Sequence, residues 1–189
     1  MPLCDRASWR VLRRCSVRPG CGWPLFEGVE MGIYPFKQYS AKVPAGWVDF
    51  NGHMNTKHYG LVIYEAHIAF TEHLDLGERY RYANNLSKAL VETHCVFERE
   101  LCEGDDIEVV SWLLAVDDKR LHTFHEIYCT NKDYRAAAGE HLDVHIDLET
   151  RRVSPFPPDV LERLRTVEKE YARFPRPAKV GSTIRAPVR

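Results

Sequence analysis

The sequence predicts one α+β domain in which an antiparallel sheet packs against a long helix. Two patterns carry this prediction: one amphipathic stripe runs through residues 56–74, and four strand-like runs separated by short turn signals follow it. The chain has 189 residues and is 44% hydrophobic, so it can bury one substantial core. We expect a domain at residues 35–174, an extension before it at residues 1–34 and a loose tail after it at residues 175–189.

The N-terminal extension differs in composition from the domain. Its early acid, Asp5, stands against five arginines, namely Arg6, Arg10, Arg13, Arg14 and Arg18. This composition favours a disordered extension, or translation that starts at Met31, although an arginine-rich and acid-poor leader also fits an organelle transit peptide. It does not fit a secretory signal, which needs an apolar stretch of about seven to fifteen residues.

The domain begins with an extended segment at residues 41–48 and continues into the long helix at residues 56–74. Apolar side chains recur in the helix at spacings of three and four, namely Tyr59, Val62, Ile63, Ala66, Phe70 and Leu74. At a rise of 1.5 Å per residue the helix is about 28 Å long. An irregular connection at residues 75–87 leads to the strands.

Four strands are expected, at residues 89–101, 107–116, 121–130 and 136–148. Short turn signals separate them, so we expect consecutive strands to pair as antiparallel hairpins. In the last strand one face is apolar and the other carries His141, Asp143, His145 and Asp147. We expect that polar face to be a solvent-facing sheet face or a subunit contact. An amphipathic helix at residues 159–173 closes the domain.

Composition excludes several classes of partner and site. The formal net charge of -1 gives no general attraction to nucleic acid. No apolar run approaches the roughly 18 residues that would predict a membrane-spanning helix. The six cysteines form no CxxC pair, which favours reduced thiols in the cytoplasm over a zinc site or a disulfide framework.

The histidines also predict no metal site. His141 and His145 share a strand face but lie about 13 Å apart at 3.3 Å per residue, which is too far to bind one ion. His122 and His125 lie on opposite faces of the preceding strand. We therefore expect neither a metal nor a cofactor.

Residues 47–59 are the strongest candidate for a functional site. Asp49 ends the extended segment, and Gly52 supplies a turn with positive φ. Asn55 or Thr56 then begins the helix as its N-cap. A carboxylate therefore lies beside unpaired backbone N–H groups at the positive end of a helix dipole, an arrangement suited to acyl chemistry. The alternative is an Asx turn, in which Asp49 only accepts hydrogen bonds from nearby backbone amides.

The neighbouring polar side chains each have two interpretations. His53 either orients Asp49 or a water molecule, or is a loop histidine bonded to backbone. Asn55 is a helix cap or a part of the site. Tyr59 belongs to the core or reaches the pocket with its hydroxyl. Glu65 on the helix is a solvated or interface residue rather than the catalytic carboxylate.

The order of elements and the loop before the helix resemble the hot-dog fold, and within it the 4-hydroxybenzoyl-CoA thioesterase-like acyl-CoA thioesterases. The resemblance covers residues 37–150 and is most specific at Asp49-Phe50-Asn51-Gly52-His53-Met54-Asn55 with Tyr59. A closer resemblance, to the betainyl-CoA thioesterases of carnitine breakdown, rests on Asp118-Lys119-Arg120-Leu121-His122 and Pro155-Phe156-Pro157-Pro158. The resemblance implies a curved sheet wrapped around the long helix.

The resemblance also implies a chemistry. Asp49 would attack the thioester carbonyl or activate a water molecule, with His53 and Asn55 as the other catalytic candidates. Helix N-terminal amides near Thr56 and Lys57 would polarise the carbonyl oxygen. The implied substrate is an acyl-CoA, and the implied assembly is a homodimer or homotetramer with active sites at the shared interface.

A CoA ester also needs partners for its phosphates and its acyl group. The available basic pairs are Lys119 with Arg120 and Arg151 with Arg152, which are otherwise solvated turn charges. The acyl group would lie near Gly52 and Thr56. If it carries a quaternary ammonium, aromatic side chains would supply cation–π attraction, and the candidates, otherwise core fillers, are Trp47, Phe50, Tyr59 and Trp112.

Two functions of other classes remain open. A catalytically silent hot-dog module would bind acyl-CoA or a protein partner without turnover. A hydratase or dehydratase would need a different, histidine-centred site, and release of free CoA would separate it from a thioesterase.

Overall fold

The computed structural model describes residues 36–184 of the chain. The elements follow in the order β1 (Phe36–Lys42), η1 (Ala45–Trp47), α1 (Thr56–His73), α2 (Glu78–Asn84), β2 (Leu86–Phe97), β3 (Asp106–Val116), β4 (Arg120–Cys129), β5 (Tyr134–Asp147), β6 (Arg152–Val153) and α3 (Pro158–Tyr171). The N-terminal extension at residues 1–34, with Cys4, Cys15 and Cys21, lies outside the described residues.

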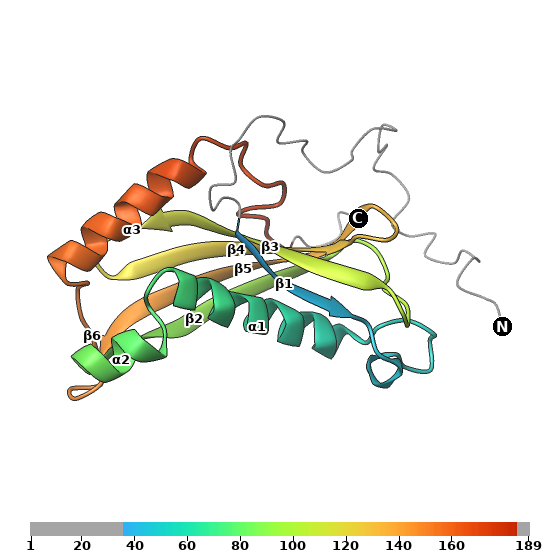
Figure 1. The fold of residues 1–189 in the computed structure, drawn as a ribbon, viewed down its shortest axis with the longest axis horizontal. Coiled ribbons are helices and arrows are strands. Elements are labelled where there is room, and N and C mark those ends of the chain that lie inside the picture. Colours follow the sequence, from blue (N-terminus) through green and yellow to red (C-terminus); the bar gives the residue numbers. More distant parts are fainter. Residues whose placement is uncertain (1–35, 185–189) are drawn as a thin grey trace.

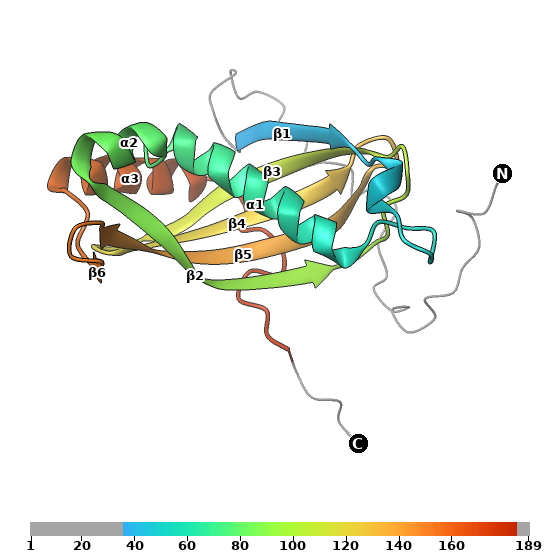
Figure 2. The same ribbon diagram turned by 90° about the horizontal axis from the view of Figure 1, so that it is seen from below.

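The long helix α1 lies across one face of the sheet, and α3 packs beside β3 and contacts the end of α1 through Tyr171 and Phe70 (Figure 1, Figure 2). Val62, Ile63 and Ala66 of α1 are at most 1% exposed and belong to an aliphatic core under the helix. Trp112 of β3 packs against Tyr171 of α3. The expected architecture, a curved antiparallel sheet around one long helix with a helix at the C-terminal end, is confirmed.

The strand order is β1-β3-β4-β5-β2, with β6 paired to β5. The expected hairpins β3–β4 and β4–β5 are confirmed. The expected hairpin between β2 and β3 is wrong, because β2 pairs with β5 at the opposite edge of the sheet from β1. The turn signal after β2 instead belongs to a crossover, where the Gly104 N–H donates to the carbonyl of Val43 (2.8 Å) and the Val43 N–H donates to the carbonyl of Asp105 (2.9 Å).

Two local assignments also differ from the expectation. The first strand ends at Lys42 rather than at residue 48, because Pro44 precedes a 3-10 turn that bends the chain out of the sheet. The connection after α1 contains the short helix α2. It has no apolar stripe that could have signalled it, since Tyr80 is its one buried side chain, and Asn85 ends it with a φ of 53°.

The histidine face of β5 is buried, so the expectation of a solvent-facing sheet face or a subunit contact is wrong. His141, Asp143 and His145 are at most 3% exposed. The helices supply polar partners for this face. His67 of α1 lies 3.2 Å from Asp143, and the hydroxyl of Tyr80 in α2 lies 2.8 Å from Nε2 of His145. Polar side chains can be buried where such partners exist, and alternation along one strand does not reveal partners from other elements.

The helix α1 approaches β5 so closely that one strand position requires glycine. A Cβ atom at Gly139 would lie 2.8 Å from the side chain of Ile63, closer than two carbon atoms can pack. Ile63 is 1% exposed and has no space into which it can move. This contact fixes the height of α1 above the sheet, and with it the position of the loop from which α1 starts.

Within residues 36–184 no helix combines the length and the apolar character needed to cross a membrane. Cys95 and Cys129 are free thiols, and burial raises the pKa of both. For these two residues the expectation of reduced cysteines is confirmed, but for Cys102 it is wrong, because that residue is disulfide-bonded.

Candidate active site

The Asp49 loop, residues 48–54, is a closed turn between η1 and α1. Its two ends form an isolated antiparallel bridge. Inside the loop the Asp49 N–H donates to the carbonyl of His53 (3.1 Å), and the Gly52 N–H donates to the carbonyl of Asp49 (2.9 Å). Gly52 has a φ of 81°, so the expected positive φ is confirmed and accounts for a glycine at this turn.

Backbone hydrogen bonds fix the loop to its surroundings. The Met54 N–H donates to the carbonyl of Leu101 in the crossover after β2 (2.7 Å), and the Asn55 N–H donates to the carbonyl of Trp47 (2.9 Å). Met54 is 1% exposed and anchors the loop in the core. The loop is therefore held in place at the end of the sheet where α1 begins.

The carboxylate of Asp49 accepts one hydrogen bond on each oxygen. Oδ1 accepts from the N–H of Asn51 (2.8 Å), which makes an Asx turn, and Oδ2 accepts from Nδ2 of Asn55 (2.9 Å). The backbone bond from Asn51 and then the side-chain bond from Asn55 lower the pKa of Asp49. The carboxylate is ionised at neutral pH, and each oxygen keeps a lone pair free to react. The Asx turn and a catalytic role are therefore compatible.

Asn55 joins this carboxylate to the start of α1. Its Oδ1 accepts from the Lys57 N–H (3.1 Å), so the expected N-cap is confirmed. The expectation that the Lys57 N–H faces a substrate is wrong, because Asn55 already occupies it. In the described part of the chain the Thr56 N–H has no protein acceptor, which leaves it as the available donor at the positive end of the helix.

His53 and Tyr59 are bonded to backbone rather than to the carboxylate. Nδ1 of His53 lies 3.4 Å from the carbonyl oxygen of Met54, and Nε2 lies 4.0 Å from Glu100. Tyr59 is 4% exposed, and its hydroxyl accepts from the N–H of Leu101 (3.1 Å). His53 thus fits the interpretation as a loop histidine. Tyr59 fits the interpretation as a core residue, and a contact with the substrate stays a prediction.

Two of the other aromatic candidates lie at the loop and one does not. Trp47 is half-buried and stacks on His58 with a centroid distance of 5.2 Å. Phe50 lies in the loop itself and is 97% exposed. Trp112 lies in the middle of β3, where its Nε1 donates to Oε2 of Glu126 (2.8 Å) and its ring contacts Tyr171 of α3. The expectation that Trp112 contacts the substrate is therefore wrong.

The two basic pairs lie at the end of the sheet opposite to the Asp49 loop (Figure 2). Lys119 and Arg120 form the turn between β3 and β4, and Arg151 and Arg152 form the turn between β5 and β6. The eleven residues of β3 span about 36 Å at 3.3 Å per residue, so both turns are far from the start of α1. Within one subunit these residues are therefore far from the Asp49 loop, and their phosphate contacts stay a prediction.

Glu65 lies on the outer side of α1, where it is exposed and its Oε2 accepts from the hydroxyl of Tyr39 (2.8 Å). This exposure agrees with the expected solvated or interface residue, and its lack of a catalytic role stays a prediction.

The sequence alone did not reveal one cluster of chemically capable residues. His67, His125 and His141 are all buried and meet between α1 and the sheet. A signal was present, since His67 continues the apolar stripe that contains Ala66 and Phe70 and must therefore face the sheet. The sequence did not indicate that His125 and His141 lie close together, because their proximity depends on the pairing of β4 with β5.

Comparison with known proteins identifies relatives. The family model described as the thioesterase-like superfamily matches residues 43–164. The betainyl-CoA thioesterase of Pseudomonas aeruginosa is 34% identical over 149 residues, which cover 79% of this chain and 94% of that protein. The L-carnitine dehydrogenase/betainyl-CoA thioesterase of Agrobacterium fabrum is 37% identical over 161 residues, which cover 85% of this chain but 32% of that protein.

Solved structures share the fold. A proposed thioesterase from Pseudomonas putida KT2440 is 28% identical, with a TM-score of 0.68 over 83% of this chain and 100% of that chain. A Staphylococcus aureus protein solved in complex with CoA is 24% identical, with a TM-score of 0.72 over 80% of this chain and 97% of that chain. The expected hot-dog thioesterase fold is thereby confirmed.

We expect Asn55→Ala to raise the pKa of Asp49 and to lower the free energy of unfolding by about 0.5–2 kcal/mol, because it removes both a donor to the carboxylate and the helix N-cap. NMR titration of the Asp49 carboxyl carbon and urea denaturation measure the two effects. Asn51→Ala is the matched control, since Asn51 acts mainly through its backbone N–H. An Asp49 pKa unchanged by Asn55→Ala would contradict the bridging role of Asn55.

Proposed function

Because the chain belongs to the thioesterase-like superfamily, we propose that it hydrolyses acyl-CoA thioesters with Asp49 as the catalytic carboxylate. One observation carries the proposal: an ionised carboxylate is fixed beside the Thr56 N–H at the positive end of α1. The carboxylate supplies a nucleophile or a general base, and the N–H supplies a donor for the oxyanion. Thioester hydrolysis needs both groups at one carbonyl.

In the proposed reaction the carbonyl oxygen of the thioester accepts a hydrogen bond from the Thr56 N–H. Asp49 either adds to the carbonyl carbon, forming an anhydride that water then opens, or takes a proton from the water molecule that attacks. By either route the C–S bond breaks, its electron pair leaves with the CoA sulfur, and the thiolate is protonated. One oxyanion donor of this kind contributes about 10²- to 10³-fold in rate.

Asn55 and His53 are proposed to act through Asp49 rather than on the substrate. Asn55 holds Oδ2 of the carboxylate at 2.9 Å while it caps the helix, so it fixes the distance between the carboxylate and the Thr56 N–H. His53 contributes by charge, because its imidazolium form lowers the pKa of Asp49. Both are positioning residues in this proposal.

We propose betainyl-CoA as the substrate. The two curated relatives that are 34% and 37% identical to this chain carry betainyl-CoA thioesterase in their names. Betaine ends in a trimethylammonium group, which aromatic faces attract through cation–π interaction. Phe50 is 97% exposed in the Asp49 loop, and Trp47 is half-buried beside it. These two side chains are proposed to contact the cationic end of the acyl group.

We propose a homodimer that forms through the free edge of β2. This edge strand has twelve residues, and Leu90, Val91 and Phe97 are exposed on it. An unpaired edge of this length is a template for another strand. The Asp49 loop is near its end, because Phe97 contacts Tyr59 in the first turn of α1 (centroids 5.4 Å).

Antiparallel pairing of two β2 strands would bring the opposite end of the partner's sheet to the Asp49 loop. Leu86 at the start of β2 pairs with Asp147, which in turn pairs with Arg152. The β5–β6 turn of one subunit would therefore approach the active site of the other. In this arrangement Arg151 and Arg152 of one subunit are proposed to bind the phosphates of a CoA ester in the active site of the other subunit.

A second contact could extend the dimer to a tetramer. The outer side of α1 exposes three large apolar side chains at spacings of three and four, namely Leu61 (42%), Tyr64 (51%) and Ile68 (41%). Packing of this stripe against its copy in another dimer would bury it.

We also propose that the enzyme works in the cytoplasm. The free thiols of Cys95 and Cys129 are compatible with a reducing compartment.

Asp49→Asn should lower kcat by at least about 10²-fold, because it removes the charge while keeping the shape and an acceptor for the Asn51 N–H. Release of CoA thiol measures turnover. Glu65→Gln, which changes a carboxylate on the outer side of α1, should leave turnover unchanged. Retained turnover in Asp49→Asn would exclude Asp49 as the catalytic group. Wild-type protein that binds CoA esters without releasing thiol would instead support a silent binding module.

Betainyl-CoA should be hydrolysed with a higher kcat/KM than 3,3-dimethylbutanoyl-CoA, in which a carbon atom replaces the ammonium nitrogen. Cation–π attraction of about 0.5–1 kcal/mol predicts a preference of about 2- to 5-fold after each rate is divided by that of uncatalysed hydrolysis. Phe50→Leu should reduce this preference while leaving the neutral ester unaffected. If the wild-type enzyme gave equal corrected kcat/KM values for the two esters, recognition of a cationic acyl group would be refuted.

Val91→Lys should dissociate the dimer, because it places a charge on the exposed edge of β2. Multi-angle light scattering after size-exclusion chromatography measures the mass, and thiol release should fall with the dimer fraction. Thr166→Lys is the matched control, since Thr166 is also β-branched and exposed but lies on α3, which packs beside β3 and not beside β2. A Val91→Lys variant that keeps the mass and activity of the wild type would rule out this interface.

A further inference from the structure

Three buried histidines from three elements meet between α1 and the sheet. His67 comes from α1, His125 from β4 and His141 from β5, and their exposed fractions are 1%, 0% and 3%. One ring nitrogen of each lies within 4.8 Å of those of the other two. Twelve residues separate His67 from Asn55, so the cluster lies about 18 Å along the helix from the Asp49 loop. It is therefore separate from the proposed active site.

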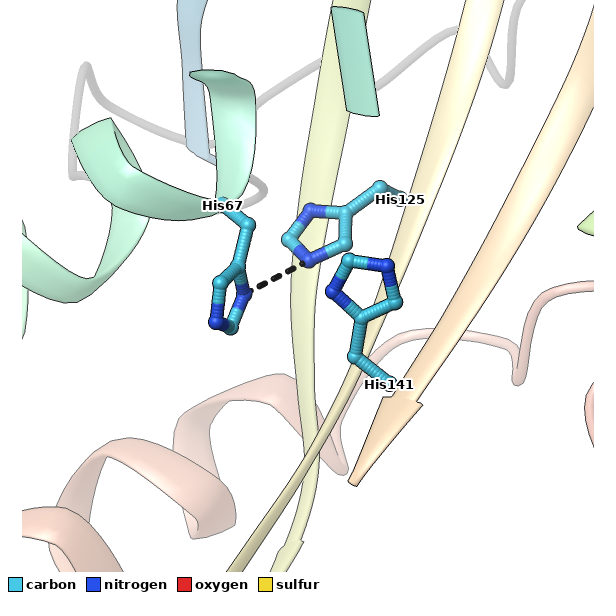
Figure 3. Close-up of side chains that lie close together, drawn as sticks. All are labelled: His67, His125 and His141. Carbon is cyan, nitrogen blue, oxygen red and sulfur yellow. Dashed lines mark hydrogen bonds between the residues drawn. The ribbon is translucent and has the colours of Figure 1, made fainter. Parts of the chain in front are cut away.

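The ring nitrogens of the three histidines converge on one point (Figure 3). Nδ1 of His67 lies 3.1 Å from Nε2 of His125. His141 turns its ring towards this pair, and its Nδ1 is buried with no hydrogen-bond partner in the described part of the chain. Buried polar atoms are almost always partnered, so an unpartnered nitrogen facing two others calls for a ligand.

The surroundings of His125 prepare one nitrogen to bind a cation. Its Nδ1 lies 2.9 Å from Oγ of Ser111, and donation to that oxygen fixes the proton on Nδ1. The lone pair of Nε2 then faces Nδ1 of His67 (3.1 Å) and the hydroxyl of Thr123 (3.3 Å), and a bound cation would replace these contacts.

The ring of His67 lies beside a carboxylate, as the rings of metal-binding histidines commonly do. Its Nε2 lies 3.2 Å from the carboxylate of Asp143, which is 0% exposed. Donation of the Nε2 proton to Asp143 leaves the lone pair of Nδ1 facing the centre. Lys88 also reaches Nε2 (3.0 Å) and can donate to it instead, in which case Nδ1 carries the proton and donates to His125. Binding of a cation selects the first arrangement.

We propose that His67, His125 and His141 bind one divalent transition-metal ion such as Zn²⁺ and thereby pin α1 to the sheet. Neutral imidazoles are ligands for this class of ion, and a carboxylate behind one of them is the usual support. Zn–N bonds of about 2.0–2.1 Å require nitrogens about 3.3 Å apart, so the rings move together slightly on binding.

The proposal reverses the expectation of no metal. That expectation compared His141 with His145 and His122 with His125, which are pairs within single strands. The site combines one member of each pair, His141 and His125, with His67, a helix residue 58 positions before His125 in the sequence.

The untagged full-length chain, freed of metal with a chelator and dialysed, should bind one Zn²⁺ per chain in calorimetric titration. Co²⁺ should give the absorption of a tetrahedral site, and Zn²⁺ should raise the thermal midpoint because it binds the native state alone. His141→Phe keeps the aromatic contacts and removes the ligand, so it should weaken Zn²⁺ binding more than 100-fold. His73→Phe, on the same helix but outside the cluster, should bind as the wild type does.

Failure of the wild type to bind Zn²⁺ stoichiometrically would overturn the proposal, as would unchanged binding by His141→Phe. If His141→Phe does not fold, X-ray absorption of the Co²⁺-loaded wild type decides the matter. Three imidazole nitrogens in the first shell support the site, and any other ligand set refutes it. These measurements do not depend on thioester hydrolysis, so the metal site and the proposed function can fail independently of each other.

Discussion

The side-chain amide of Asn55 is the contact on which the rest of the candidate site depends. Its oxygen accepts from the first turn of α1, and its nitrogen donates to Asp49. The Asn55 amide therefore positions both the N-terminus of α1 and the carboxylate of Asp49, and it links the two directly. The close contact of α1 with β5 at Gly139 then sets where this pair lies relative to the sheet. The geometry of the candidate site at this turn thus depends on the packing of α1.

The interface between α1 and the sheet changes character along the helix. Near the active-site end it is aliphatic, with Val62 and Ile63 at its centre. One turn further on it becomes polar, where His67 meets Asp143 and the strand histidines. Buried polar groups stabilise a fold only when they are partnered, and most of those in the described chain are partnered by another element. Nδ1 of His141 is an exception, which is why this part of the interface points to a ligand.

Signals within a few residues of each other predicted the core of the site, whereas long-range contacts did not follow from the sequence. Asp49, Gly52 and Asn55 act through neighbours in the chain, so turn and cap preferences were sufficient to find them. Trp112 was assigned wrongly because the face of β3 on which it lies depends on where α3 packs. The expected β2–β3 hairpin failed because a turn signal does not distinguish a hairpin from a crossover.

The lowered pKa of Asp49 has a consequence for how the carboxylate reacts. Hydrogen bonds that stabilise the ionised form also make the oxygen a weaker base and nucleophile, so the proposed rate must come from elsewhere. The Thr56 N–H and the helix dipole stabilise the oxyanion, and their effect grows as water is excluded. In a single subunit the loop is open to solvent, with Phe50 97% exposed. Closure by a second subunit and by the acyl-CoA itself would strengthen these interactions, so assembly and catalysis are coupled in this proposal.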